Sequence, residues 1–214
     1  MPHRAAGLIL VLAALLSSTA AAAQGVPAPP GPYVVDVRGV SSGLPQGAVF
    51  LLPGAADLSV PSRGNGFDVG GHIYAGRFRG ARLGFGANLV SARGKAVPPR
   101  TTSSIGDDPE GPPAVSVTLR TIAPQISLNF GTTDGWSYLS AGAGITEVRA
   151  RTIDVVEASR NSGSLLTINA GGGARWFVKR RLGVGFDARL YRLGKTNTMS
   201  SSMLFAIAAG ISLR

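Results

Sequence analysis

The chain contains no cysteine, which excludes disulfide frameworks, thiol catalysis and cysteine-based zinc sites. Charged residues are also scarce, at 15% of 214 positions, and the basic ones are scattered instead of forming the runs typical of nucleic-acid-binding proteins. After residue 23, no segment reaches the roughly 20 apolar residues that a membrane-spanning helix requires. Glycine, by contrast, is abundant, at 30 residues. The composition therefore argues against a disulfide-rich miniprotein, a charged helical protein and a nucleic-acid partner.

An export signal is predicted over residues 1–23. Arg4 precedes the apolar segment LILVLAALL, and small residues then lead to Ala21 and Ala23, which fit the preference of a signal peptidase. A helical membrane anchor is the alternative, but residues 17–19 are polar and interrupt a segment already too short to span a bilayer. We therefore expect cleavage after Ala23.

From residue 33 onward, apolar residues alternate with polar or very small ones, the pattern of a strand whose two faces meet different surroundings. Residues 24–32 are rich in proline and are expected to form an extended lead. Residues 33–214 are left as one folded domain. Eight segments follow the alternating pattern: residues 33–41, 66–78, 81–91, 114–130, 135–149, 163–178, 182–192 and 201–214.

Two of these segments are irregular. Residues 115–119 place apolar side chains on odd positions, whereas residues 122–130 place them on even positions. Such a change of phase predicts a β-bulge near Arg120 and Thr121.

In residues 135–149 the faces are harder to assign. We predict Trp136 and Tyr138 on the outer face, and Glu147 and Arg149 on the inner face. Aromatic residues near strand ends are typical of membrane interfaces. The predicted interface aromatics are Tyr33, Trp136, Tyr138 and Trp176.

Long and short connections alternate along the chain, with tight joints at RFRGAR, GTTDGW and VKRRL. This order places all long loops at one end of an up-and-down sheet. In hydrocarbon, every backbone polar group needs an internal partner, so such a sheet must close on itself. The predicted fold is therefore all-β, an eight-stranded antiparallel up-and-down transmembrane β-barrel.

A soluble eight-stranded barrel of the lipocalin type would show the same alternation. The composition of the polar face argues against it, because that face consists mostly of glycine, serine, threonine and asparagine with isolated charges. The three lysines, Lys95, Lys179 and Lys195, all fall in predicted connections. Small inward residues also suit the narrow lumen of an eight-stranded barrel.

Ionisable residues on the polar face are predicted to form a network inside the lumen, because a buried charge must be paired or hydrated. Salt bridges that fill the lumen and fix the strand register are the favoured interpretation, and a gated ion path is the alternative. The predicted lumen residues are Asp36, Arg38, Asp68, His72, Arg82, Arg120, Arg175, Asp187 and Arg189.

The export signal, the eight alternating segments and the alternating connections resemble the small bacterial outer-membrane β-barrels, with OmpA-like and OmpW-like transmembrane domains. This resemblance implies an outer-membrane location and assembly by the barrel assembly machinery. Gly210, Ile211 and Leu213 match the C-terminal assembly signal of such barrels, although Arg214 stands in place of the terminal aromatic residue. The resemblance implies a monomer without a cofactor or metal.

Some small outer-membrane barrels modify lipid A, so an enzyme is a further alternative. A general base needs a nucleophile within hydrogen-bond reach. After cleavage, His72 is the one remaining histidine, with Asp68 on the same face, and no G-x-S-x-G motif is present. We therefore expect no catalytic residues.

The predicted long loops carry acidic as well as basic residues. The basic ones would attract the phosphates of lipopolysaccharide, and an ordinary solvated loop surface is the equal alternative. The first loop also contains the apolar segment GAVFLLPGAA, which would fold back over the mouth of the barrel or contact an apolar ligand. The expected function is a structural or surface-interaction role, with a narrow channel for ions or small apolar solutes as the alternative. The basic loop residues are Arg63, Arg93, Lys95, Arg100, Arg151, Arg160 and Lys195.

Overall fold

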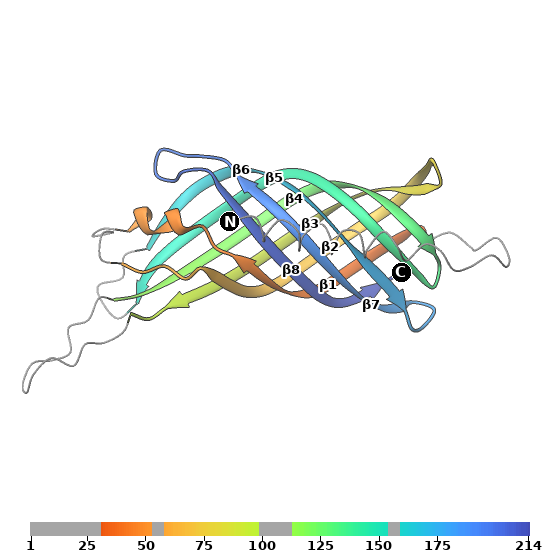
Figure 1. Cartoon of the computed structure of the whole chain (residues 1–214), viewed down its shortest axis with the longest axis horizontal. Coiled ribbons are helices and arrows are strands. Elements are labelled where there is room, and N and C mark those ends of the chain that lie inside the picture. Colours follow the sequence, from red (N-terminus) through yellow and green to blue (C-terminus); the bar gives the residue numbers. More distant parts are fainter. Residues whose placement is uncertain (1–30, 53–57, 99–112, 154–158) are drawn as a thin grey trace, which may run out of the picture.

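The computed structural model describes residues 31–52, 58–98, 113–153 and 159–214. Within these residues the chain forms eight antiparallel strands, each paired with its neighbours in sequence, and β8 pairs back to β1 to close the barrel (Figure 1). The predicted fold is confirmed. The elements are β1 (Tyr33–Gly43), η2 (Gln46–Leu51), β2 (Arg63–Phe78), β3 (Ala81–Ala96), β4 (Ala114–Thr132), β5 (Gly135–Ile153), β6 (Ser159–Phe177), β7 (Leu182–Leu193) and β8 (Ser202–Leu213).

The predicted export signal, and the lead up to residue 30, lie outside the described residues. Among the described residues, no helix is both long and apolar enough to cross a membrane.

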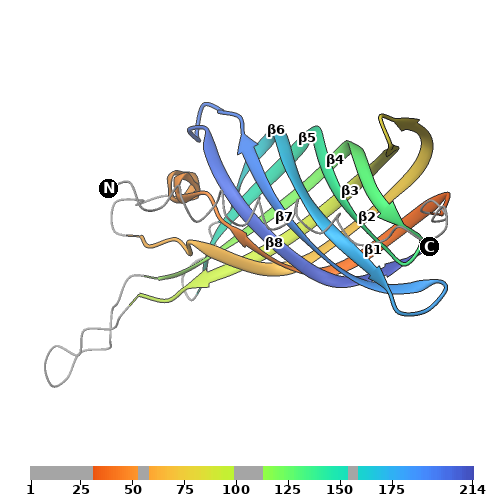
Figure 2. The same ribbon diagram turned by 45° about the vertical axis from the view of Figure 1, so that its right-hand side comes forward.

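The short turns lie together at one end of the barrel, at the right of Figure 1, and η2 and the connection from β7 to β8 lie at the other. The β2–β3 turn consists of Arg79 and Gly80, whose φ angles of 47° and 84° are both positive. This is the geometry of a two-residue hairpin, in which a right-handed twist carries over from strand to strand. Figure 2 shows the strands inclined around the barrel.

The outward face of the barrel carries a broad band of exposed apolar side chains. They come from all eight strands, and on β1, β2, β3, β6, β7 and β8 they occupy the parity that the alternation assigns to the exterior. Members of this band include Val35, Val37, Val69, Phe85, Leu89, Ile122, Ile126, Ile145, Leu166, Ile168, Val184, Leu190, Ile207 and Ile211. A continuous apolar exterior on a closed barrel matches the lipid-facing surface of outer-membrane barrels.

Three layers of side chains fill the lumen along its length. Near the short turns, Val34, Tyr74 and Trp136 form an apolar cluster with Phe177. The middle holds charged and amide side chains. Toward the long loops the lumen is apolar again, and we call this part the apolar lumen layer; it includes Val40, Val90, Val115, Val117, Leu119, Val148, Leu165, Leu193 and Leu204.

The connection after β1 folds back over the mouth at the long-loop end. Leu44, Ala48, Leu51 and Leu52 are buried against the apolar lumen layer, and η2 contacts β5 and β6. Of the two alternatives for this apolar segment, its described part therefore takes the first, covering the mouth; residues 53–57 lie outside the described part.

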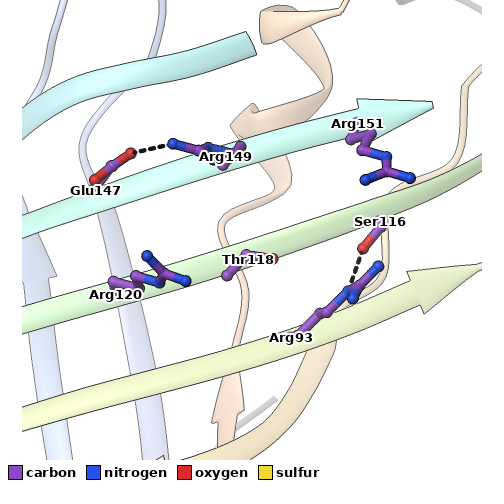
Figure 3. Close-up of a pocket in the computed structure, with 7 residues that line it drawn as sticks. All are labelled: Arg93, Ser116, Thr118, Arg120, Glu147, Arg149 and Arg151. Carbon is purple, nitrogen blue, oxygen red and sulfur yellow. Dashed lines mark hydrogen bonds and ion pairs between the residues drawn. The ribbon is translucent and has the colours of Figure 1, made fainter. Parts of the chain in front are cut away.

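β4 differs from the prediction, because it keeps a single phase along its length. Its pairing with β3 runs without a register shift from Ala96↔Val115 to Arg82↔Asn129, so no bulge interrupts it near Arg120. Residues 115, 117 and 119 therefore point into the lumen, and Arg120 points outward beside Thr118 (Figure 3). Toward the long loops, the exterior of β4 is polar and the lumen is apolar. Toward the short turns, the exterior is apolar and the lumen is polar. The apolar side chains of β4 therefore change from inward to outward positions along the strand.

The predicted faces of β5 are reversed. Trp136 and Tyr138 are buried inside the barrel, and Arg149 is exposed on the outside, where it pairs with Glu147. Beside the short turns, large aromatic side chains fill the lumen. An aromatic residue near the end of a strand therefore does not by itself identify the outer face.

Candidate functional site

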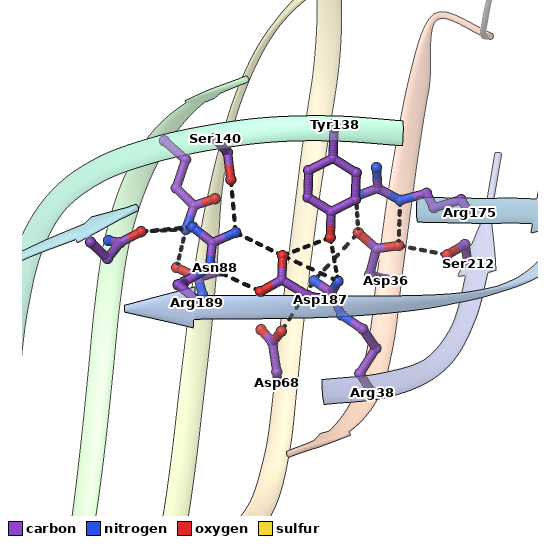
Figure 4. A network of polar contacts seen from close by, with 12 residues as sticks. Asp36, Arg38, Asp68, Asn88, Tyr138, Ser140, Arg175, Asp187, Arg189 and Ser212 are labelled. Carbon is purple, nitrogen blue, oxygen red and sulfur yellow. Dashed lines mark hydrogen bonds and ion pairs between the residues drawn. The ribbon is translucent and has the colours of Figure 1, made fainter. Parts of the chain in front are cut away.

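The middle of the lumen contains a cluster of paired arginine and aspartate side chains, drawn in Figure 4. Inward positions of β1, β2, β6 and β7 supply them, because alternation brings every second residue of a strand to the same face. We call this cluster the lumen network. Its charged members are Asp36, Arg38, Asp68, Arg175, Asp187 and Arg189.

Asp36 of β1 is the partner of Arg175 of β6. Arg175 donates two hydrogen bonds to its carboxylate, from Nε at 2.9 Å and from Nη2 at 2.5 Å. The Ser212 hydroxyl of β8 donates a third, at 2.7 Å. The guanidinium of Arg175 also stacks 4.0 Å from the centre of the Tyr138 ring. A bidentate pair of this kind holds both side chains in one orientation.

Arg38 lies between three carboxylates. Its Nη2 is 3.1 Å from Asp68, and Nη1 donates a 2.7 Å hydrogen bond to the Tyr138 hydroxyl, which donates in turn to Asp187 at 2.7 Å. Asp36 and Asp187 lie 3.7 and 3.8 Å from the same guanidinium. Arg38 and Tyr138 thus connect the two halves of the network.

Arg189 of β7 completes the cluster. It makes a bidentate pair with Asp187, two residues away on the same strand, through Nε at 3.1 Å and Nη2 at 2.9 Å. Its remaining hydrogen bonds, both 2.7 Å long, go to Asn169 of β6 and Ser140 of β5. The arginine therefore links three strands.

Amide side chains extend the network to β3 and β4. The Gln125 amide donates to Asn88 at 2.7 Å and to Asn169 at 3.3 Å, and Asn88 donates a longer contact, 3.5 Å, to the Tyr191 hydroxyl. Beyond them, the hydroxyls of Thr121 and Thr167 each lie within hydrogen-bond distance of Thr146. Polar contacts consequently run from strand to strand around the inside of the barrel.

The charges of the lumen network balance, since three arginines face three aspartates, and all six residues are at most 5% exposed. Balanced, hydrogen-bonded charges are the arrangement in which burial away from water is tolerated. Chemically, such a network can fill the lumen and fix the register of the strands. It leaves no open carboxylate pair or activated nucleophile among the described residues.

His72 is buried close to the network but does not join it. Within the described part of the chain, neither ring nitrogen has a hydrogen-bond partner. No pairing with Asp68 is formed, and Asp68 instead faces Arg38. Nor do the described residues contain a group of histidine, aspartate and glutamate side chains that could hold a metal ion.

The other two predicted lumen residues lie apart from the network. Arg82 has the inward parity but is half-buried near the short turns, where it lines a small pocket with Tyr74 and Arg77. Arg120 lies on the exterior, which corrects its predicted placement. The alternation of residues 115–119 predicts the wrong face for Arg120, because the apolar residues of this part of β4 face the lumen.

Several network members were not predicted. Asn88, Ser140, Asn169 and Ser212 are uncharged, and selection by charge passed over them although Asn88 and Asn169 stood on the polar parity. Tyr138 is predicted on the opposite face, whereas Gln125 stands on the correctly predicted polar parity of residues 122–130 and is uncharged. For Asn88, Gln125, Asn169 and Ser212 the polar parity is the signal. Ser140 and Tyr138 lie on β5, whose predicted faces are reversed, so the pattern gives no signal for them.

Of the predicted interface aromatics, Tyr33 and Trp176 are exposed near the short turns, while Trp136 and Tyr138 lie in the lumen. In the predicted assembly signal, Ile211 and Leu213 face outward and Gly210 lies opposite Arg38 across the β1–β8 seam. A Cβ atom at Gly210 would come within 2.3 Å of the Val37 carbonyl oxygen and 2.6 Å of the Arg38 Cα. The glycine permits this close approach of the first and last strands.

Comparison with sequences finds no matching family model and no matching curated protein. Solved structures do match. The neisserial surface protein A, NspA, aligns with a TM-score of 0.53 at 14% identity, over 86% of this chain and 97% of that one. Ail, the attachment invasion locus protein of Yersinia pestis, aligns with a TM-score of 0.48 at 12% identity, over 86% and 99%. The outer membrane protease OmpT from Escherichia coli aligns at 0.41 and 15%, over 71% and 64%.

The match to NspA, with its TM-score of 0.53, shows a shared fold. With its single closed sheet of consecutive antiparallel strands, the chain has the eight-stranded β-barrel architecture of NspA.

Proposed function

We propose that the chain is a bacterial outer-membrane β-barrel with a structural or surface-contact role, and that it neither conducts solutes nor catalyses a reaction. One observation carries the proposal: apolar side chains cover the exterior of a closed sheet, while the charged residues of its middle are paired inside. In water this arrangement would expose a large apolar surface, which soluble monomers avoid. In lipid the same surface is buried.

The interior argues against a channel. A conducting pore needs a continuous polar or hydrated path. Here the lumen network lies between the apolar cluster at Trp136 and the apolar lumen layer, and the turn η2 covers the mouth. Eight strands already leave an interior that side chains can fill.

The interior also argues against lipid A chemistry at His72. The imidazole is 6% exposed and faces the lumen, so a lipid substrate outside the barrel does not reach it. A general base must lie within hydrogen-bond distance of the group that it deprotonates. Cells expressing the protein should therefore keep an unchanged lipid A mass spectrum, and a new lipid A species that disappears with His72→Ala would overturn the non-enzymatic proposal.

Membrane insertion is tested by expressing the full chain in a Gram-negative host and separating the membranes. We expect the protein in the outer-membrane fraction, with faster gel mobility before boiling than after, because a closed barrel resists detergent until it is heated. Recovery in the soluble periplasmic fraction, with equal mobility in both lanes, would overturn the proposal. Conductance is tested separately in planar bilayers, where we expect no steady current.

A further inference from the structure

The exterior of the barrel carries a basic pocket at the long-loop end of β3, β4 and β5. The pocket has a volume of about 290 Å³ and is lined by Arg93, Ser116, Thr118, Arg120, Glu147, Arg149 and Arg151 (Figure 3). This is near the lower end of the range for small-ligand pockets, roughly 300 to 1,000 Å³. We call its four arginines the arginine patch.

Strand register brings the arginine patch together. Arg93 lies opposite Thr118, and Thr118 lies opposite Arg149 on the far side. One outward position along the strands toward the loops, Ser116 is flanked by Lys95 and Arg151; one position the other way, Arg120 is flanked by Ser91 and Glu147. Small side chains therefore alternate with arginines across the sheet, which gives room for a ligand between the guanidinium groups.

The charge of the pocket is strongly positive. Four arginines face one carboxylate, and that carboxylate already accepts hydrogen bonds from Arg149, at 3.2 Å, and from Asn161. Arg93 donates to the Ser116 hydroxyl at 2.9 Å. Arg120 is exposed on the rim of the pocket and forms no ion pair with any of the described residues. An anion with several oxygens complements such a site, because guanidinium groups bind phosphate through paired hydrogen bonds.

The position of the patch indicates which anion. The next outward row along the strands toward the short turns is entirely apolar: Val69, Leu89, Ile122, Ile145 and Leu166. Arg120 and Ile122 are consecutive outward residues of β4, so the exterior changes from apolar to cationic within one step of a strand, about 7 Å. A ligand that fits both rows has acyl chains against the isoleucines and phosphate against the arginines.

We propose that the arginine patch binds the phosphate groups of a lipid in the outer leaflet, with its acyl chains against the Leu89–Ile122–Ile145 row. This inference rests on the proposed membrane function and the usual orientation of outer-membrane barrels, whose long loops face outward. Arg120 and Arg149 are the residues assigned to the headgroup. The site differs from the lumen network, which the wall of the barrel separates from lipid.

The test uses the full-length processed protein, folded in detergent and verified by its heat-dependent gel mobility. Lipid adducts are measured by native mass spectrometry with lipid A carrying two phosphates, with the same lipid after enzymatic dephosphorylation, and with inorganic pyrophosphate alone. We expect preferential retention of the phosphorylated lipid, by about tenfold over the dephosphorylated one. Equal retention of both lipids would overturn the proposal, as would binding of pyrophosphate as strong as that of the lipid.

Variants locate the site. The double variant Arg120→Gln/Arg149→Gln should lose about tenfold in affinity for phosphorylated lipid A, whereas Arg77→Gln/Arg192→Gln should retain it. The control pair also removes two exposed arginines, Arg192 from the outward parity of β7 and Arg77 from the short-turn end of β2, where it lies opposite Arg82. Equal losses in both doubles would mean diffuse attraction and would refute a specific site.

The comparison of phosphorylated with dephosphorylated lipid A uses the unmodified protein, so it tests the proposed site even if a variant folds poorly. If the protein folds with heat-dependent mobility but shows no phosphate preference, the lipid site fails while the barrel proposal holds. If it shows no such mobility, the barrel proposal itself fails.

Discussion

Asp36 and Arg175 form a bidentate ion pair across the lumen, between strands β1 and β6 that are not neighbours in the sheet. Such a pair connects opposite walls of the barrel, and neither side chain is more than 2% exposed. Its loss cannot be compensated by water as readily as the loss of a surface pair.

We predict that Asp36→Ala lowers the free energy of unfolding by about 3 to 5 kcal/mol, because it leaves a buried arginine unpaired. The double variant Asp36→Ala/Arg175→Met should recover much of this loss, since the stranded charge is gone. Urea unfolding of the barrel in lipid vesicles, followed by gel mobility, measures both.

The exposed pair Glu147–Arg149 supplies the control for this experiment. Its side chains are 39% and 56% exposed, so Glu147→Ala should change stability by at most about 1 kcal/mol. A change as small in Asp36→Ala would contradict the assigned role of the lumen pair.

A second prediction concerns conductance. Arg38→Ala removes the centre of the lumen network, yet it leaves the apolar lumen layer unchanged, and a dry apolar segment blocks ions on its own. Both the unmodified protein and the variant should therefore show no steady current in planar bilayers. A current that appears with Arg38→Ala would mean that the charged residues, and not the apolar layer, close the lumen.

A third prediction concerns the seam. Gly210→Ala places a methyl group against the Val37 carbonyl and the Arg38 backbone, so the fraction of heat-modifiable barrel after refolding should fall. Gly39→Ala is the matched control, because its Cβ would meet no atom closer than the Ala209 oxygen at 3.9 Å. Similar yields for the two variants would argue against a tight β1–β8 contact at Gly210.

A fourth prediction concerns the phase of β4. Because the chain has no cysteine, single cysteines can be introduced and labelled without a background. In lipid vesicles, a fluorophore at Ile122→Cys should be quenched by lipids brominated in their acyl chains, and one at Arg120→Cys should be quenched less. Leu119→Cys faces the lumen and should resist labelling until the barrel unfolds. Ready labelling at residue 119 would contradict the single phase of β4 and support the change of phase predicted from the sequence.

The alternating sequence was sufficient to predict the strands and the closed barrel, and it also placed Asp36, Arg38, Asp187 and Arg189 on the inward parity. It was sufficient because, along β1, β7 and β8, one face meets apolar surroundings over nearly the whole strand. A single rule then holds from end to end.

The rule failed on β4 and β5 because it assumes that apolar residues always face outward. Toward the long loops the exterior is polar, as at Arg149, and the interior is packed with Val117 and Leu119. Near the short turns, Trp136 fills the lumen. Alternation shows that two faces differ, but it does not show which face is inside, so the residues of the arginine patch could be recognised as a group only from the strand register.

The apolar interior at the long-loop end means that the upper part of the barrel has the polarity of an ordinary water-soluble protein. From Ile122 to Ala114, β4 continues for eight residues beyond the last apolar outward row on that strand. At about 3.3 Å per residue and a tilt near 40°, this corresponds to roughly 20 Å above that row. The long-loop end of β4 therefore stands well beyond the apolar outward band, on strands that pack around the apolar lumen layer.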